Sequence, residues 1–227
     1  MIATDYDGTL ANNERVRKST LETLACVRRS GRKLLLVTGR ELESLRSVFA
    51  ELDLFDLIVA ENGALLYHPS TGTETCLAKR PPAAFVEALR RSGVKDLSAG
   101  RCIVATLRPH EEDVYHAIEE LDLNLHVILN RESVMVLPVG VDKSTGFRAA
   151  MAELQLPLTS AVGIGDAEND YAFLNLCGLS VAVGNAIPSL KQRADVVTSR
   201  KNGAGVVELL QKLLTSENSF DMAHPRR

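Results

Sequence analysis

The chain has 227 residues, of which 45% are hydrophobic, and its 26 basic and 29 acidic side chains give a net charge of -3. These fractions are typical of a folded globular protein and exclude disordered and fibrous classes. The balanced charge lacks the basic field of most nucleic-acid-binding proteins. No apolar run reaches the roughly 18–20 residues of a membrane span. Because the first residues also lack a signal-peptide pattern, we expect a cytoplasmic protein without nucleic-acid or membrane partners.

The four cysteines are widely spaced and form no C-x-x-C pair. This spacing argues against a disulfide scaffold or a structural zinc site. We expect plain buried thiols, since free cysteine packs as a small hydrophobe. The cysteines are Cys26, Cys76, Cys102 and Cys177.

Short apolar runs alternate with helical stripes at both ends of the chain. The runs are continuously hydrophobic, which predicts strands buried on both faces of a parallel sheet. Strand–helix alternation of this kind indicates a doubly wound α/β core. In chain order, the predicted strands are 2–4, 33–37, 57–60, 160–164, 179–183 and 195–197, and the helices are 19–30, 41–52, 143–154 and 204–214.

Residues 64–138 interrupt this alternation. Their pattern predicts two hairpins, a further strand and two helices, which together indicate a separate α+β module. We therefore expect a discontinuous core formed by residues 1–63 and 139–214, an inserted module at 64–138, and a polar tail at 215–227. Within the module, the predicted elements are a hairpin at 64–77, a helix at 82–92, a strand at 101–107, a helix at 111–121 and a hairpin at 125–137.

Two carboxylates, Asp5 and Asp7, directly follow the first predicted strand, and Gly8 allows the chain to turn sharply after them. In α/β proteins, side chains at this end of a strand project into the ligand-binding crevice. The pair therefore predicts a catalytic or binding position. The alternative is an acidic turn that caps a helix.

Two further motifs could bind an anion. Thr38-Gly39-Arg40 follows the second strand, where a hydroxyl and backbone N–H groups near a helix start would suit phosphate. The alternative is that Thr38 only caps the helix. Lys143 lies at a helix start, where the helix dipole disfavours a cation unless an anion lies in front of it. The alternative for Lys143 is a solvated surface lysine.

Acidic residues crowd the loop after the strand at 160–164, in the segment Gly165-Asp166-Ala167-Glu168-Asn169-Asp170. Such a loop is destabilised by charge repulsion unless a positive group is present. Mg²⁺ with oxygen ligands is the simplest solution. A dinucleotide site is disfavoured, because the third glycine of that fingerprint is missing and the acids would face the pyrophosphate. Together, the four segments supply the groups for metal-assisted phosphoryl transfer through an aspartyl-phosphate.

In their order and spacing, these motifs resemble the four signature motifs of the haloacid dehalogenase (HAD) superfamily. The insertion between the second and third motifs, and the sequence Glu61-Asn62-Gly63 just before it, are similar to the Cof-like branch, subfamily IIB. That branch includes phosphoglycolate, sucrose-phosphate and sugar-phosphate phosphatases. The resemblance covers about residues 1–214 and implies a Rossmann-like doubly wound parallel core with an inserted α+β cap domain.

The resemblance also implies roles for the motif residues. Asp5 would be the nucleophile, and Asp7 the general acid and then the base. Thr38 and Lys143 would bind the phosphoryl oxygens. Mg²⁺ would be held by Asp5, the backbone carbonyl of Asp7, and Asp166, with Asp170 as a further acid of the site. The residues expected to bind substrate are Thr38, Gly39, Arg40, Asn62, Lys143 and Asn169, the last by orienting the loop or Lys143.

In the inserted cap, Arg101, Arg108 and Arg131 are candidate contacts for the leaving group, each with a solvated surface charge as its alternative. The sequence thus predicts a Mg²⁺-dependent phosphatase for a small phosphorylated metabolite of the sugar-phosphate or phosphoglycolate type. The alternatives are a phosphomutase of the same superfamily and a non-catalytic phosphate-binding regulatory module. The presence of Asp7 argues against the module, because binding alone needs no acid–base group.

Overall fold

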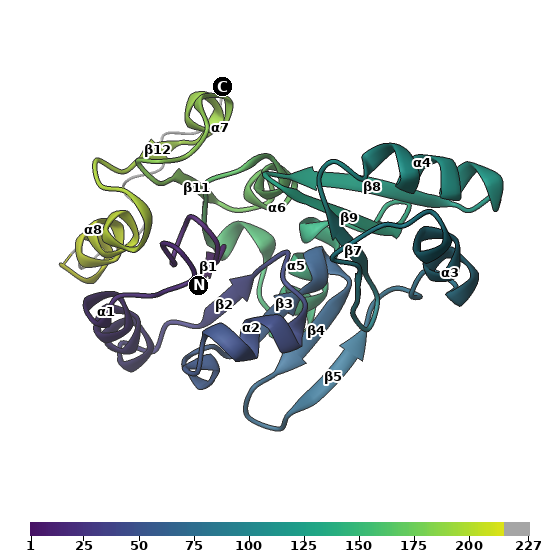
Figure 1. Ribbon diagram of the computed structural model, residues 1–227. Coiled ribbons are helices and arrows are strands. Elements are labelled where there is room, and N and C mark those ends of the chain that lie inside the picture. The colour runs from purple at the N-terminus through teal and green to yellow at the C-terminus, as the bar shows by residue number, and fades with distance from the viewer. Residues whose placement is uncertain (216–227) are drawn as a thin grey trace.

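The computed structural model describes residues 1–215, which form an eight-stranded core sheet, a four-stranded second sheet and helices packed on both (Figure 1). The core sheet has the order β12-β11-β10-β1-β2-β3-β4-β5. Its strands are β1 (Ile2–Thr4), β2 (Leu34–Val37), β3 (Leu57–Ala60), β4 (Leu65–His68), β5 (Thr73–Cys76), β10 (Val162–Gly165), β11 (Leu179–Ala182) and β12 (Val196–Val197).

Six neighbouring strands, β12 to β3, are parallel, and the strand order reverses between β1 and β10. From this switch point the chain winds outward in both directions. Strands β1, β2, β3 and β10 are buried along their whole length, as their continuous hydrophobicity predicts. The predicted doubly wound α/β core is confirmed.

Helices cover both faces of the core sheet. On one face, the apolar stripes of α1 (Lys18–Arg29), α2 (Leu42–Val48) and α8 (Asn202–Thr215) pack into a shared cluster. On the other face, α5 (Lys143–Glu153), α6 (Tyr171–Leu174) and α7 (Pro188–Arg193) form a second cluster. Single 3₁₀ turns connect some elements: η1 (Leu52–Leu54), η2 (Glu61–Gly63), η3 (Leu158–Ser160) and η4 (Glu168–Asp170).

The helix predicted at 41–52 is shorter than its periodicity indicates. Phe49 ends α2 in an extended conformation, and its ring packs against Tyr6 and Phe55, with ring centroids 5.4 and 6.2 Å away. Tertiary packing of this aromatic side chain therefore ends the helix, and the chain resumes as η1.

The second sheet belongs to residues 83–138, which we call the cap module (teal in Figure 1). Helices α3 and α4 pack on one face of this sheet, against Val104, Val134 and Val136. The alternate residues Ala105, Ser133 and Met135 therefore face the other way, and they line a cavity described below. The elements are α3 (Ala83–Arg91), β6 (Ser98–Ala99), β7 (Val104–Leu107), α4 (Glu111–Glu120), β8 (Leu125–Asn130) and β9 (Ser133–Pro138), in the sheet order β6-β7-β9-β8.

The hairpin predicted at 64–77 forms, but not in the cap. Strand β4 pairs antiparallel with β3, and β5 pairs with β4, so both strands extend the core sheet. The side chains of Leu65 and Leu66 join the clusters on opposite faces of that sheet. The expectation that the insertion begins at residue 64 is therefore not met for these two strands, because β4 is buried in the core and β5 is hydrogen-bonded to β4.

The expectation that the cysteines are buried is met for two of the four. Cys102 and Cys177 are buried as expected, whereas Cys26 and Cys76 are exposed. Among residues 1–215, no helix is both long and apolar enough to cross a membrane. The predicted tail, residues 215–227, lies outside the described residues except for Thr215, which ends α8.

Candidate active site

Three predicted site residues lie at the carboxyl ends of adjacent parallel strands. Asp5 follows β1, Thr38 follows β2 and Asp166 follows β10. Because β1 and β10 flank the point where the strand order reverses, their ends diverge into a crevice, the usual ligand site of such sheets. The topology thus brings together motifs that lie up to 161 residues apart in the chain.

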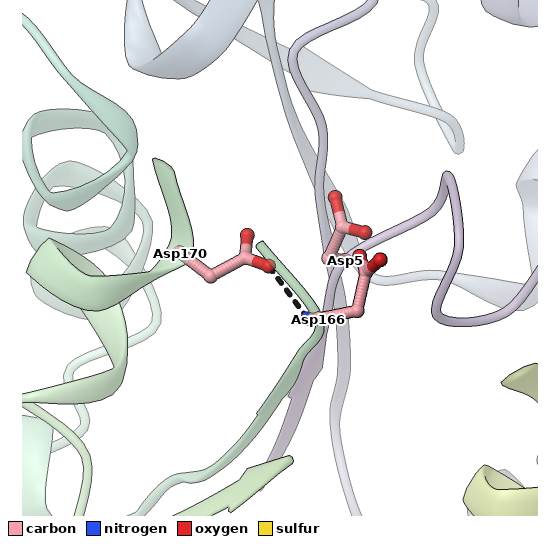
Figure 2. A group of neighbouring side chains, drawn as sticks. All are labelled: Asp5, Asp166 and Asp170. Carbon is pink, nitrogen blue, oxygen red and sulfur yellow. Dashed lines mark hydrogen bonds between the residues drawn. The ribbon is translucent and has the colours of Figure 1, made fainter. Parts of the chain in front are cut away.

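Asp5, Asp166 and Asp170 form a buried carboxylate cluster, with one oxygen of each within 4.8 Å of the others (Figure 2). Asp170 comes from η4, and its Oδ2 accepts hydrogen bonds from the backbone N–H groups of Asp166 (2.8 Å) and Ala167 (3.0 Å). The carboxylate of Asp170 therefore shapes the loop that carries Asp166.

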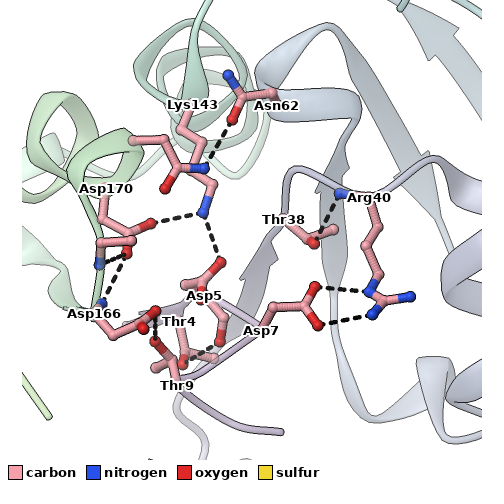
Figure 3. Close-up of polar contacts among 12 residues, drawn as sticks. Thr4, Asp5, Asp7, Thr9, Thr38, Arg40, Asn62, Lys143, Asp166 and Asp170 are labelled. Carbon is pink, nitrogen blue, oxygen red and sulfur yellow. Dashed lines mark hydrogen bonds and ion pairs between the residues drawn. The ribbon is translucent and has the colours of Figure 1, made fainter. Parts of the chain in front are cut away.

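Lys143 lies between two of these acids. Its Nζ donates to Oδ1 of Asp5 and to Oδ1 of Asp170, both at 2.6 Å (Figure 3). Asp142 caps α5 by accepting a hydrogen bond from the backbone N–H of Ser144 at 2.8 Å. This cap fixes Lys143 as the first residue of the helix. Lys143 is 1% exposed, so the alternative of a solvated surface lysine is wrong.

The charges of this cluster do not balance. Burial raises the pKa of Asp5 well above its usual value; the ammonium of Lys143 opposes this, and the carboxylates of Asp170 and Asp166 add to it. Burial and the charge of Asp170 likewise raise the pKa of Asp166. Burial alone would lower the pKa of Lys143, but its two ion pairs outweigh burial and raise it. The Lys143 ammonium and the half-exposed guanidinium of Arg131, 2.6 Å from Asp166, thus face three carboxylates. The cluster is still short of positive charge, which a divalent cation with oxygen ligands would supply.

Asp7 points to the other side of the crevice and forms a two-pronged ion pair with Arg40. The distances are 2.7 Å from Nε to Oδ2 and 2.9 Å from Nη2 to Oδ1 (Figure 3). Arg40 also donates to Glu14 at 2.8 Å. Burial alone would lower the pKa of Arg40, but these carboxylates outweigh burial and raise it. Arg40 therefore holds the Asp7 carboxylate in a defined orientation.

Thr38 is buried, and its Oγ1 accepts from the backbone N–H of Arg40 at 3.1 Å. Helix α2 begins only at Leu42, with Glu41 in the N-cap position. The alternative that Thr38 caps this helix is therefore wrong. Its hydroxyl instead shapes the turn between β2 and α2, which presents Gly39 and Arg40 to the crevice.

Asn62 and Asn169 meet side by side. The Asn169 amide donates to Oδ1 of Asn62 at 3.2 Å, and both groups lie against Gly39. The remaining atoms, Nδ2 of Asn62 and Oδ1 of Asn169, are buried without a partner among the described residues. This pair connects the 3₁₀ segment η2 to the loop that follows β10.

A cavity of about 530 Å³ opens between these core loops and the crevice-facing side of the cap sheet. Asp5 and Asp7 line the same cavity. The cavity is lined by Asp5, Asp7, Gly39, Arg40, Glu41, Ser44, Ser98, Ile103, Ala105, Asn130, Arg131, Glu132, Ser133 and Met135.

The three candidate arginines of the cap have different surroundings. Arg131 reaches into the crevice, and its Nη2 lies 2.6 Å from Oδ2 of Asp166. Arg101 pairs with Glu74 of the core sheet at 2.9 Å, and Arg108 pairs with Glu111 of α4 at 3.1 Å. Only Arg131 of these three lines the cavity.

Several supporting residues were assigned no contact or role from the sequence, although Glu61 belongs to the segment Glu61-Asn62-Gly63 noted there. Thr9 donates to Oδ1 of Asp166 at 3.2 Å. The Glu61 carboxylate accepts backbone N–H groups from the cap module at Arg101 (2.8 Å), Cys102 (2.6 Å) and Ile103 (3.1 Å). Two further asparagines, Asn185 and Asn202, donate to the carbonyl of Gly8. No sequence signal marked the contacts of Thr9, Asn185 and Asn202, because their partners lie far away in the chain.

The family model described as haloacid dehalogenase-like hydrolase matches residues 2–90 and 101–210. The chain belongs to this family. Phosphoglycolate phosphatase 2 of Saccharolobus solfataricus is 33% identical to it, over 95% of this chain and 92% of that protein. The phosphoglycolate phosphatase of Sulfolobus acidocaldarius is 31% identical, over 96% and 97%. The chain is thus a HAD phosphatase, as the motifs predict.

Solved structures of the superfamily share the fold. A haloacid dehalogenase-like hydrolase from Bacteroides thetaiotaomicron superposes with a TM-score of 0.80 at 19% identity, covering 93% of this chain and 98% of that one. A HAD subclass IIB sugar phosphatase superposes with a TM-score of 0.74 at 18% identity, with the same coverage. The predicted resemblance to the Cof-like branch is confirmed at the level of the fold.

Proposed function

We propose that this HAD phosphatase is Mg²⁺-dependent and hydrolyses a small phosphorylated metabolite of the phosphoglycolate type through an aspartyl-phosphate on Asp5. The observation that carries the proposal is a buried group whose Asp5 lines the same cavity as Asp7; its members are Asp5, Lys143, Asp166 and Asp170. The names of the two curated relatives, both phosphoglycolate phosphatases, support the substrate class.

Asp5 is the proposed nucleophile. Lys143 holds one of its oxygens at 2.6 Å, which orients the carboxylate and offsets its repulsion of a phosphate dianion. An Asp5 oxygen would form the new bond to phosphorus while the bond to the leaving oxygen breaks. Water then hydrolyses the resulting acyl phosphate and releases inorganic phosphate and free Asp5.

Asp7 is the proposed acid and base. It would give its proton to the leaving oxygen in the first step and take one from the attacking water in the second. In the structure Arg40 binds both oxygens of the Asp7 carboxylate, at 2.7 and 2.9 Å, which is the form that accepts a proton from water. To carry the proton for the first step, Asp7 would give up the bond at one oxygen and keep the bond at the other. Lys143 and the turn shaped by Thr38 would contact the transferring phosphoryl oxygens.

The donor set fits Mg²⁺. The cluster offers oxygen ligands from three buried acids, and the charges of Lys143 and Arg131 together leave it one positive charge short. Asp5, Asp166 and the Asp7 carbonyl would hold the cation. Asp170 would act mainly as a positioning residue, because its two oxygens already bind Lys143 and the loop N–H groups. When bound, Mg²⁺ neutralises phosphoryl charge as a Lewis acid.

Replacement of Asp5 by Asn tests the proposal. With Mg²⁺ and phosphoglycolate, we expect phosphate release to fall by roughly 10³-fold or more, because the amide cannot act as the nucleophile. Asp53→Asn, at an exposed position of η1, is the matched control and should behave like the unaltered protein. Substantial phosphate release by Asp5→Asn would refute the assigned nucleophile. Appearance of a transferred phosphate ester in place of inorganic phosphate would indicate a phosphomutase.

A further inference from the structure

Arg131 occupies the turn between β8 and β9, at the edge of the cap module nearest the core. It has a positive φ of 54°, and its side chain reaches across to Asp166 of the core. Arg108 steadies this turn by donating from Nε to the Arg131 carbonyl (3.0 Å) and from its backbone N–H to the Glu132 carbonyl (2.9 Å). The position of Arg131 is therefore set by the cap backbone.

The core makes room for this arginine. Gly8, with a φ of +85°, lies directly beneath the ion pair, and a Cβ at this position would overlap both Nη2 of Arg131 and Oδ2 of Asp166. Arg131 nevertheless remains 56% exposed, whereas Asp166 is only 4% exposed. The guanidinium thus reaches the acid from the solvent side, through a gap that only glycine leaves open.

A cation held by Asp166 would disturb this contact. A divalent ion on either oxygen of the carboxylate places two further positive charges beside the guanidinium, and like charges in a partly buried site repel strongly. Arg131 would then leave Asp166. Because its exposed side chain needs no unfolding to move, it can turn into the cavity that it already lines.

Once released, Arg131 would be a free cation among the residues of 1–215 that line this cavity. The other lining arginine, Arg40, is bound to Asp7 and Glu14. The lining residues Glu41 and Glu132 add negative charge, which disfavours a second phosphate dianion as the ligand. A single carboxylate suits a guanidinium, because the two planar groups can form parallel charge-assisted hydrogen bonds.

We propose that Arg131 determines specificity by binding a carboxylate on the leaving group of the substrate, after a cation at Asp166 releases it from its ion pair. This inference rests on the proposed function and adds to it a residue and a chemical class, a phosphomonoester of a small hydroxy acid. In the absence of the cation, the same arginine is paired with the Asp166 carboxylate and competes with a metal ion for it.

Substrate comparison tests the recognition. Phosphoglycolate and ethyl phosphate differ by a carboxylate in place of a methyl group, so the ratio of their kcat/KM values measures recognition of that carboxylate. For Arg131→Ala, with Mg²⁺, we expect this ratio to fall roughly 10- to 100-fold. Arg131→Lys should restore part of this ratio, because lysine keeps the positive charge but lacks the two parallel N–H donors of the guanidinium.

Arg101→Ala is the matched control. Arg101 is also a cap arginine, 55% exposed, but it pairs with Glu74 and lies outside the cavity lining. Its variant should keep the ratio of the unaltered protein. An Arg131→Ala variant that retains the ratio overturns the proposal. If the unaltered protein hydrolyses neither ester, the proposed function itself has failed, which is a separate result.

Calorimetric titration with Mg²⁺ alone tests the release from Asp166 without measuring activity. Arg131→Ala should bind Mg²⁺ several-fold more tightly than the unaltered protein, because the competing guanidinium is gone. Arg101→Ala should bind it with unchanged affinity. Equal or weaker Mg²⁺ binding by Arg131→Ala would overturn the competition at Asp166.

Discussion

The two sides of the crevice hold their charges in different ways. On the core side, Lys143 is 1% exposed and its two carboxylate partners come from β1 and η4 of the same sheet-and-loop framework. On the cap side, Arg131 is 56% exposed and reaches Asp166 from another module. The core pairs are fixed because separating them would leave buried charges, whereas the cap pair can exchange its partner at low cost.

Loss of the Lys143 charge should have the largest effect on stability. In Lys143→Met, in metal-free buffer, we expect the free energy of unfolding to fall by about 3–5 kcal/mol, because buried carboxylates lose their partner. Mg²⁺ should restore part of this loss. Urea unfolding with and without Mg²⁺ measures both effects. Lys18→Met, whose side chain is 90% exposed, should change stability by less than about 0.5 kcal/mol.

Asp170 and Asp166 should differ although both are buried acids of one cluster. Asp170→Asn should lose about 2–3 kcal/mol of unfolding free energy without metal, because its carboxylate accepts charge-assisted bonds from Lys143 and the loop. Asp166→Asn should change stability by less than about 1 kcal/mol, since removing a like charge offsets its lost contacts. Calorimetry should show that Asp166→Asn loses Mg²⁺ binding. The opposite order of stabilities would make Asp170 a ligand and Asp166 the positioning residue.

Replacement of Glu61 tests whether the contact between the core and the cap module contributes as much to stability as the buried ion pairs of the core. In Glu61→Ala, three backbone N–H groups of the cap module lose their acceptor, and we expect a loss of about 2 kcal/mol. Denaturant unfolding checks the value. Glu22→Ala, on the exposed face of α1, provides the control for removing a carboxylate.

The contribution of Glu61 to the stability of the protein should depend on pH in a definite direction. Burial raises the pKa of Glu61, in spite of the hydrogen bonds from the cap backbone. The folded protein therefore holds the Glu61 proton more tightly than the unfolded chain does. Its contribution to stability is present below the unfolded pKa and is lost as pH rises through the folded pKa. Relative to the unaltered protein, Glu61→Gln should become more stable as pH rises from about 4 to 7; an opposite trend would contradict this assignment.

Arg131 should have the smallest effect on stability. Its ion pair is half-exposed on the arginine side, and pairs of this kind contribute about 0–1 kcal/mol. Thermal unfolding of Arg131→Ala should therefore remain close to that of the unaltered protein in metal-free buffer. A loss as large as that of Lys143→Met would remove the distinction between the two sides of the crevice.

The catalytic motifs could be predicted from the sequence because they rest on local rules. Continuous apolar runs predicted buried parallel strands, and in such a sheet the polar residues that follow the strands must meet at one edge. Asp5, Thr38 and Asp166 were placed correctly on this basis. The helix start at Lys143 was also correct, since Asp142 is a strong N-cap residue.

Properties that depend on a distant partner could not be predicted in this way. A hairpin pattern shows that β4 and β5 pair with each other, but not that β4 also pairs with β3. Similarly, the sequence offered three equivalent cap arginines, and only the tertiary structure brings Arg131 to Asp166.

The sequence by itself determined the α/β class, the strand ends that carry the site and membership of the HAD phosphatases. Periodicity, capping and motif spacing are properties of the chain itself, and they leave a readable pattern. The tertiary structure alone decided that Lys143 is buried between Asp5 and Asp170, that the hairpin at 64–77 extends the core, and that Glu61 accepts the cap backbone. Burial and partner choice depend on which surfaces meet after folding, and residues far apart in the chain supply those surfaces.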